Sequence, residues 1–330
     1  IYIPVGIVES SRGGTRMVGW TPIEIFNSDP LMEPARKMFD RDSKKWKDSE
    51  FEKMSAKWRA ARDKYEAEVA KAKAAGKRAP ICPWAANMQA KPDISKPYGV
   101  NNPARLWNAK IAPMAGFTAR GFLWYQGESD YMWSGFKSIF EGMKKAWRKA
   151  WKKPDMYFLC VQLPSYKDNG WEYMRWDQMR ASLEDPNGGI AVSIDTGDKD
   201  DVHPRDKTLV GHRLEEAALR QVYGDNSLFQ TPRAVSAQYG KDGVLVRIDS
   251  FGDKLVGKGQ PRGFELKIDG KWVKAKPEIR GGNVFVSAPE GGAAPEGVRY
   301  LWTDWAKPDV WLYNSQNTPV FSFKFEKPQK

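Results

Sequence analysis

The chain has 330 residues, enough for about two domains, and its hydrophobic share of 41% can fill a sizeable core, so global disorder is excluded. No run of about eighteen uncharged apolar residues occurs, which excludes a transmembrane helix. The two cysteines, Cys82 and Cys160, are too few for a disulfide framework or a cysteine zinc site. The first residue is Ile1 and not Met, which indicates a processed chain or a fragment.

The net charge of +12 is concentrated in two stretches of the sequence. Residues 33–78 contain 15 Lys and Arg against 9 Asp and Glu, half of the excess, and residues 144–153 form a second basic cluster. Opposite charges in the first stretch stand at helical spacing, as on a solvated helix. Neither stretch carries a nucleic-acid-binding motif. We therefore interpret both stretches as solvent-exposed, charged faces of helices and keep nucleic-acid binding as a weak alternative. We expect no membrane partner.

The predicted elements begin with a short apolar strand over residues 1–8, which leads into a Ser-Arg-Gly-Gly-Thr turn at 11–15. Residues 33–78 predict a long helix, and the prolines between 80 and 97 predict an extended loop. Beyond this loop, compact apolar runs predict buried strands that alternate with helical patterns. In chain order these are strand 121–125, helix 136–151, strand 156–163, helix 170–183, strand 189–194 and helix 207–223.

After residue 223 the pattern changes to short alternating runs, which are separated by Gly, Pro and Asp at hairpin spacing. The sequence therefore predicts an α/β fold over residues 1–228, with a parallel sheet flanked by helices and a charged helical insertion at about 33–79. Residues 229–330 are predicted to form an antiparallel β-sandwich module.

Three predicted turns carry residues suited to catalysis, because the carboxyl ends of parallel strands open into one crevice. The paired Gly13 and Gly14 would let backbone N–H groups approach a ligand oxygen closely, as an oxyanion hole requires, although an ordinary turn explains them as well. Gln126 follows the strand 121–125, and its side-chain amide can donate to a developing oxyanion. The nearby Glu128 is better explained as a structural acid than as a proton carrier.

With only two histidines, His203 and His212, the choice of a general base is narrow. His203 follows a strand end in an acidic turn. An acid two or three residues upstream, Asp201 or Asp200, can hold the imidazole in one tautomer and stabilise its charged form. His212 lies within an amphipathic helical pattern and is better explained as a packed or surface residue. We therefore predict that His203 is the catalytic base.

Together these segments resemble the sialate O-acetylesterase family of SGNH-type hydrolases. The resemblance covers nearly the whole chain, and WYQGES with DVHPRDK is its most specific part. The segments that carry it are PVGIVESSRGGT (4–15), LWNAKIAPM (106–114), GFLWYQGESD (121–130), FLCVQLPSY (158–166), IDTGDKDDVHPRDKTLVGHRL (194–214) and VRYLWTDWAKPDVWLYNSQNTPVFSF (298–323).

The resemblance implies a serine esterase that removes acetyl groups from sugars such as O-acetyl sialic acid, without a metal or an organic cofactor. Asp201 and His203 match the Asp-x-His-Pro of the family's catalytic block, and Gln126 matches its Gln-Gly-Glu block. Gly13 or Gly14 matches its Gly-Gly-Thr block. Asp200 stands at the spacing common in other SGNH enzymes and is the alternative acid. The family's habits imply an extracytoplasmic protein, either secreted, periplasmic or lysosomal.

One family feature is missing from the sequence. The family's nucleophilic serine lies in a Gly-Gln-Ser-Asn segment upstream of the block that opens this chain, and no such segment occurs here. Ser129 lacks the second glycine of a nucleophile elbow, while Ser10 and Ser11 lie in the turn expected to bind the oxyanion. We expect the serine on an upstream polypeptide segment, either because the sequence is incomplete or because the enzyme is cleaved into two chains. The alternative function is a catalytically inactive carbohydrate-binding relative.

Overall fold

The computed structural model describes residues 5–45, 48–78, 80, 101–130, 135–167, 170–228 and 230–328. The chain forms two compact units. One comprises Ile1–Thr118 and Glu128–Pro154, and the other comprises Ala119–Gly127 and Asp155–Lys330. The extended loop expected at 80–97 lies outside the described residues, apart from Pro80. No helix of the described residues is long and apolar enough to cross a membrane.

The first unit is helical, and its core is rich in aromatic and methionine side chains. The amphipathic α4 (Phe136–Ala150) packs against η1, η2, α1 and α2. The indole N–H of Trp147 in α4 donates to Trp20 O at 2.9 Å, which satisfies a polar group inside this core. The other elements are η1 (Met17–Trp20), α1 (Ile23–Ser28), η2 (Pro30–Met32), α2 (Glu33–Lys45), α3 (Asp48–Ala74), η3 (Trp107–Ile111) and η4 (Ala112–Met114).

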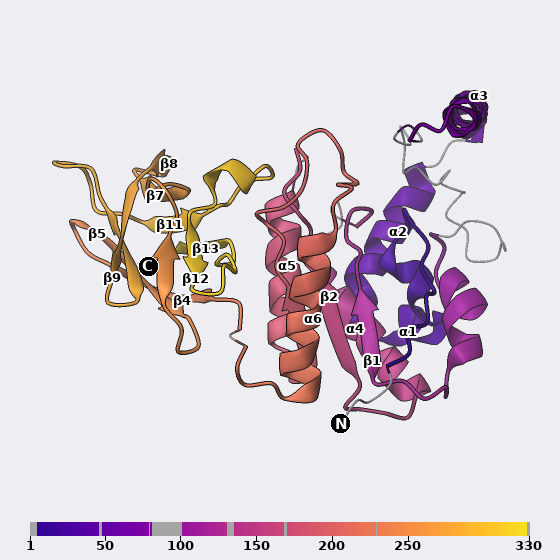
Figure 1. Cartoon of the computed structure of the whole chain (residues 1–330), viewed down its shortest axis with the longest axis horizontal. Coiled ribbons are helices and arrows are strands. Elements are labelled where there is room, and N and C mark those ends of the chain that lie inside the picture. Colours follow the sequence, from indigo (N-terminus) through magenta and orange to yellow (C-terminus); the bar gives the residue numbers. More distant parts are fainter. Residues whose placement is uncertain are drawn as a thin grey trace. The chain divides into compact units, whose positions relative to one another are not determined.

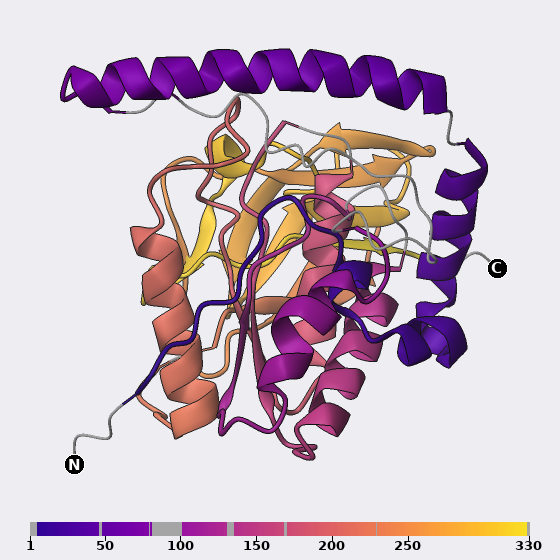
Figure 2. The same ribbon diagram turned by 90° about the vertical axis from the view of Figure 1, so that its right-hand side faces the viewer.

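The long helix expected over 33–78 is present as two helices, α2 and α3, on either side of residues 46–47, which lie outside the described residues. Figure 2 shows α3 as a long straight rod. Most of its described residues are exposed, and they form ion pairs such as Arg62 with Asp63 at 2.8 Å. Exposed pairs of this kind contribute little stability. The exposure of α3 agrees with its interpretation as a solvent-exposed, charged helix.

The strand expected at residues 1–8 is wrong over residues 5–8, the part that the structure describes. Val5, Ile7 and Val8 lie in an irregular segment, with exposed fractions of 67%, 85% and 63%. The apolar sequence predicted burial, but no strand among the described residues pairs with this segment. A buried strand needs a partner for its backbone N–H and C=O groups, and none of the described strands provides one for residues 5–8.

The second unit contains the predicted parallel sheet, which confirms the expected fold class. β1 (Gly121–Trp124), β2 (Tyr157–Val161) and β3 (Gly188–Ala191) run parallel in the order β1-β2-β3. The helices α5 (Trp171–Leu183) and α6 (Thr208–Tyr223) pack against β2 and β3 (Figure 1). β2 and β3 are almost wholly buried, as expected for strands covered on their faces. Among the described residues β1 is an edge strand, with Leu123 58% exposed.

The C-terminal region forms antiparallel sheets, as predicted. One has the order β4-β5-β10-β9, another has the order β13-β11-β7-β8, and β6 pairs with β12. Apolar side chains such as Val246, Val286, Leu266 and Val298 are fully buried in these sheets. The elements are β4 (Arg233–Tyr239), β5 (Gly243–Asp249), β6 (Leu255–Gly257), β7 (Phe264–Ile268), β8 (Lys271–Lys274), β9 (Lys276–Arg280), β10 (Asn283–Ser287), β11 (Gly297–Tyr300), η5 (Lys307–Asp309), β12 (Leu312–Asn314) and β13 (Phe323–Glu326).

The C-terminal strands and the parallel sheet lie in the same compact unit. Direct hydrogen bonds connect them, because the buried Arg175 of α5 donates to Thr303 O and, at 3.2 Å, to Asp304 O in the segment after β11. The boundary expected between residues 228 and 229 stays a prediction about domain organisation.

Candidate functional site

The loops that follow β1, β2 and β3 lie at the carboxyl edge of the parallel sheet. Gln178 of α5 connects the first two loops, because its Nε2 donates to Gln126 O at 2.9 Å and its Oε1 accepts from Leu163 N at 2.8 Å. Ser165 connects the second and third loops, since its Oγ donates to Ile194 O at 2.5 Å. Hydrogen bonds therefore hold the three loops together at one edge.

Gln126 lies in the loop after β1 and is buried, with 8% of its surface exposed. The neighbouring Gly127 has a φ of +157°, and a Cβ added to it would lie 2.9 Å from Gln178 Nε2 and 3.1 Å from Leu163 Cδ1. A side chain at this position would have to displace Gln178 or Leu163. The packing fixes the loop backbone and keeps Gln126 at the edge where an oxyanion donor is predicted.

Asp201 and His203 lie in the loop between β3 and α6. The Asp201 carboxylate accepts a hydrogen bond from the His203 backbone N–H at 2.8 Å, which closes a turn of the Asx type. His203 is exposed, and its imidazole has no hydrogen bond to any of the residues that the structure describes. The structure thus joins the pair through the backbone of His203 and not through its ring.

Asp200, the alternative acid, forms an ion pair with Lys167 in the loop after β2. The hydrogen bond and the charge of this ammonium group lower the pKa of the Asp200 carboxyl. His212 lies on α6 with 61% of its side chain exposed, and its Nε2 is 3.3 Å from Glu216 Oε1. Asp200 is therefore engaged by Lys167, and His212 is a surface residue.

Gly13 and Gly14 form a turn in the first unit. Gly14 has a φ of +66°, in the left-handed region that favours glycine, and a Cβ at Gly13 would meet nothing within 4 Å. Thr15 closes the turn by donating from its Oγ1 to Arg12 O at 2.9 Å. The turn thus has open space on the side of Gly13 where a Cβ would stand.

Ser10, Ser11 and Ser129 are the serines next to the predicted motifs. Ser10 and Ser11 lie in the irregular segment before the Gly13 turn, and Ser11 Oγ is hydrogen-bonded to Glu9. Ser129 lies in a turn that begins the second stretch of the first unit. Within the described part of the chain, none of the three is hydrogen-bonded to a histidine. That none of them is the nucleophile stays a prediction.

Sequence reasoning did not single out Arg213 of α6, which is buried with 4% exposure. Its guanidinium forms a bidentate pair with Asp195, at 2.6 Å and 2.8 Å. Asp195 follows the buried end of β3 and opens the loop that carries Asp201 and His203. The signal in the sequence was an arginine in helical register with the apolar Val210, where a buried charge needs a carboxylate partner.

A second cluster of ionisable groups lies where α5 begins. Arg175 is fully buried, and Asp304 accepts at Oδ1 from the Trp171 backbone N–H at 2.9 Å. Burial, together with a hydrogen bond to Asp304, raises the pKa of Glu172 to about 7. Burial also lowers the pKa of Arg175. Glu172 and Arg175 lie in α5, whereas Asp304 follows β11 more than a hundred residues later, so no local motif indicated this cluster.

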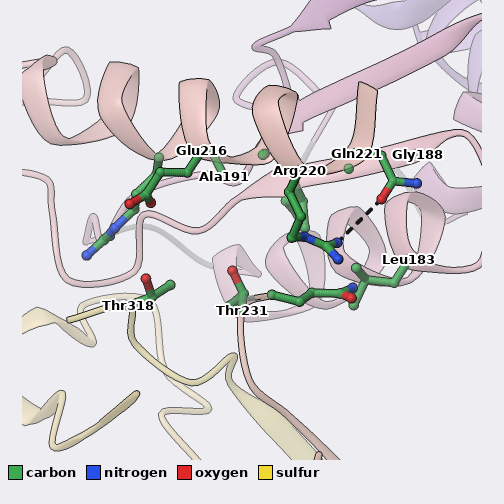
Figure 3. A pocket seen from close by; sticks show the side chains of 13 residues that line it. Leu183, Gly188, Ala191, Glu216, Arg220, Gln221, Thr231 and Thr318 are labelled. Atoms are coloured by element: carbon green, nitrogen blue, oxygen red, sulfur yellow. Dashed lines mark hydrogen bonds between the residues drawn. The ribbon is translucent and has the colours of Figure 1, made fainter. Parts of the chain in front are cut away.

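A small cavity of about 40 Å³ lies under α6. Figure 3 shows Glu216 and Arg220 on α6, with Thr231 and Thr318 of the C-terminal region opposite them. Arg220 donates to Gln221 at 3.4 Å, the bond drawn in the figure. A volume of this size holds water molecules, whereas sites for small organic ligands are several times larger, from about 300 Å³. This cavity is therefore too small for a sugar.

Residues 101–220 match the family model described as carbohydrate esterase, sialic acid-specific acetylesterase. This range contains Gln126, Asp201 and His203. The resemblance to the sialate O-acetylesterase family is confirmed over this range. The fold agrees with the resemblance, because a crystal structure of a carbohydrate acetylesterase from Xanthomonas citri is similar with a TM-score of 0.65 and 31% identity. That similarity covers 69% of this chain and 55% of the other.

Curated sialate O-acetylesterases are similar over a large part of this chain. The Mus musculus protein is 30% identical over 240 residues, which cover 62% of this chain and 44% of the relative. The Rattus norvegicus protein is 26% identical over 339 residues, which cover 92% of this chain and 56% of the relative. The Homo sapiens protein is 28% identical over 244 residues, which cover 64% of this chain and 47% of the relative. The chain thus spans about half the length of these sialate O-acetylesterases.

Proposed function

We propose that this chain supplies the general base and an oxyanion donor of a serine esterase that removes acetyl groups from carbohydrates such as O-acetyl sialic acid. The family match over residues 101–220 carries the proposal, because it includes Gln126, Asp201 and His203. The names of the relatives, sialate O-acetylesterases and a carbohydrate acetylesterase, support acetylated sugars as the substrate class. We further propose an extracytoplasmic location, which rests on the resemblance alone.

In the proposed reaction a serine Oγ attacks the acetyl carbonyl carbon while His203 accepts the hydroxyl proton. The carbonyl oxygen becomes an oxyanion that receives a hydrogen bond from the Gln126 amide. The bond to the sugar oxygen then breaks, and that oxygen takes the proton from His203. Water attacks the acetyl-enzyme in the same way, which releases acetate and returns the proton to the serine.

Asp201 orients His203 in this mechanism. Its Oδ1 already accepts the backbone N–H of His203 at 2.8 Å, which leaves Oδ2 to accept from the ring nitrogen that faces away from the serine. The mechanism requires the exposed imidazole to form that contact by rotating about its side-chain bonds. Catalytic hydrogen bonds are often loose before substrate binds, so the separation of ring and carboxylate is compatible with this role.

We propose that the nucleophilic serine comes from a segment outside these 330 residues. Two features support this proposal independently. Among the described residues β1 has a strand on one side only, with Leu123 exposed, and Val5, Ile7 and Val8 are exposed in their own unit. A further segment packed on these exposed apolar side chains would remove them from water, which stabilises the folded state.

The alternative is an inactive carbohydrate-binding relative. The exposed His203 ring favours it, because the Asp201 carboxylate contacts the backbone and not the imidazole. The two functions differ in one property, since a binding protein would retain the acetyl ester that an esterase hydrolyses.

The deciding experiment measures hydrolysis of p-nitrophenyl acetate and O-acetyl sialic acid by the chain, alone and co-produced with its upstream segment. We expect the chain alone to be inactive and poorly folded, and the combination to be active. His203→Ala should lower kcat by about 10⁴-fold or more, whereas the matched control His212→Ala should stay within about threefold. Equal losses at both histidines would contradict the assignment of a single base, and sugar binding without hydrolysis would favour the alternative.

A further inference from the structure

The loop that carries Asp201 and His203 is attached to the C-terminal strands near its beginning. Its first residue, Asp195, pairs with Arg213 in α6, and two residues later Gly197 O accepts a hydrogen bond from Lys307 Nζ at 2.9 Å. Lys307 begins η5, between β11 and β12. All of these groups belong to the second unit.

The first attachment centres on the buried guanidinium of Arg213. It donates to Val192 O at 3.0 Å, to both oxygens of Asp195, and to Asn317 O at 3.3 Å. Val192 follows β3, Asp195 opens the loop, and Asn317 lies in the turn after β12, where its φ is +68°. One planar group thus fixes three segments relative to one another, which a single ammonium group does not reproduce.

The second attachment rests on the segment after β11. Asp304 O accepts from the Tyr166 backbone N–H at 3.3 Å and from Arg175 at 3.2 Å. The Trp302 ring packs edge-on against Tyr173 and Trp176 of α5, with centroids 5.3 Å and 5.8 Å apart. The segment that presents Lys307 to Gly197 is therefore anchored on α5 and on the loop after β2.

Besides these two attachments, Ser165 donates to Ile194 O and Thr196 O at the beginning of the loop, and Lys207 near its end lies over the Tyr125 ring, 5.8 Å from the ring centroid. Residues 198–207 are mostly exposed, and the hydrogen bonds of Asp198, Asp201 and Asp206 there reach only two residues along the chain. Lys167 adds an exposed ion pair with Asp200, and such a pair contributes little. The position of His203 thus depends on how the beginning of its loop is held.

We propose that Arg213 and Lys307 are positioning residues, through which the C-terminal strands hold the catalytic loop, so that these strands are part of the esterase site. The role of His203 in this statement rests on the proposed function, whereas the effect on the loop does not. A general base contributes fully only when it is held within about 0.5 Å of its productive place, so a looser loop lowers kcat more than it raises KM.

The test uses Arg213→Lys, which keeps the positive charge but loses the bidentate guanidinium. Arg299→Lys is the matched control. Arg299 pairs with Glu265 at 2.7 Å between β11 and β7, within the same C-terminal sheets. Hydrogen–deuterium exchange of residues 196–207 and the kinetics on p-nitrophenyl acetate are measured in the protein co-produced with its upstream segment. For Arg213→Lys we expect about tenfold faster loop exchange and about tenfold lower kcat at a KM within about twofold. Arg299→Lys should change neither.

The exposed Lys307 keeps the proposal testable if Arg213→Lys does not fold. Lys307→Met should speed loop exchange and lower kcat by about threefold, and Lys307→Arg should restore both, because it can still donate to Gly197 O. Loop exchange equal to that of the control, or a lower melting temperature with unchanged kcat, would overturn the proposal. If the wild-type protein shows no esterase activity, the proposed function fails, and the exchange data alone decide whether the C-terminal strands hold the loop.

Discussion

Gly197 offers a sharp test of how tightly the loop that carries Asp201 and His203 is packed. Its φ is +99°, and a Cβ added there would lie 2.1 Å from Ser165 O, far inside van der Waals contact. Ser165 sits in the loop after β2, and its backbone N–H donates to Thr196 O at 3.3 Å. Gly197→Ala must therefore push the loops after β2 and β3 apart as well as strain the backbone.

The magnitude follows from two contributions. The left-handed backbone costs a residue with a Cβ about 1–2 kcal/mol. Relief of the contact with Ser165 O weakens at least one hydrogen bond between the loops, which adds about 1–2 kcal/mol. We therefore expect Gly197→Ala to lower the free energy of unfolding by about 3 kcal/mol.

Two other glycines separate these contributions. Gly252 has a φ of +88° with nothing within 4 Å of a Cβ, so Gly252→Ala should cost only the backbone contribution, about 1 kcal/mol. Gly211 lies within α6, also in open space, and Gly211→Ala should stabilise the protein by about 0.5–1 kcal/mol through helix propensity. Urea unfolding followed by tryptophan fluorescence measures all three. A Gly197→Ala variant no less stable than Gly252→Ala would refute the close packing of the two loops.

Three further predictions address the site and its surroundings. Gln126→Ala should lower kcat by about 10²-fold with little change in KM, because an oxyanion donor acts in the transition state; a raised KM at constant kcat would assign Gln126 to substrate binding. Asp201→Asn should reduce kcat more than Asp200→Asn, and the reverse order would move the orienting role to Asp200. The raised pKa of Glu172, about 7, means that the folded state holds its proton more tightly than the unfolded state. That stabilising contribution is complete below about pH 4.5 and is lost as the pH rises to about 7. Glu172→Gln does not titrate, so its free energy of unfolding relative to wild type should be about 1 kcal/mol more favourable at pH 8 than at pH 5, with allowance for solvent screening of this half-buried group. Equal differences in urea unfolding at both pH values would contradict the prediction.

The elements that the sequence predicted best are those with local causes. The helix expected at 136–151 is Phe136–Ala150, and the one expected at 207–223 is Thr208–Tyr223, because apolar residues at helical spacing identify a buried face without knowledge of its partner. The three strands were found for the same reason, since buried parallel strands are compact apolar runs. The strand at residues 1–8 failed, because an apolar run becomes a strand only beside another strand, and none pairs with residues 5–8 in the described part of the chain.

The candidate site shows where such local reasoning stops. The spacing of Asp201 and His203 indicates that a carboxylate can reach the residue two positions on, but it does not distinguish the ring from the backbone N–H, which are both within reach. In the structure the backbone N–H is bound, at 2.8 Å. The loop that carries the ring contacts Arg213 at Asp195 and Lys307 at Gly197. Lys307 lies 110 positions from Gly197, so a contact of the loop that carries the proposed base comes from a residue that no motif around it contains.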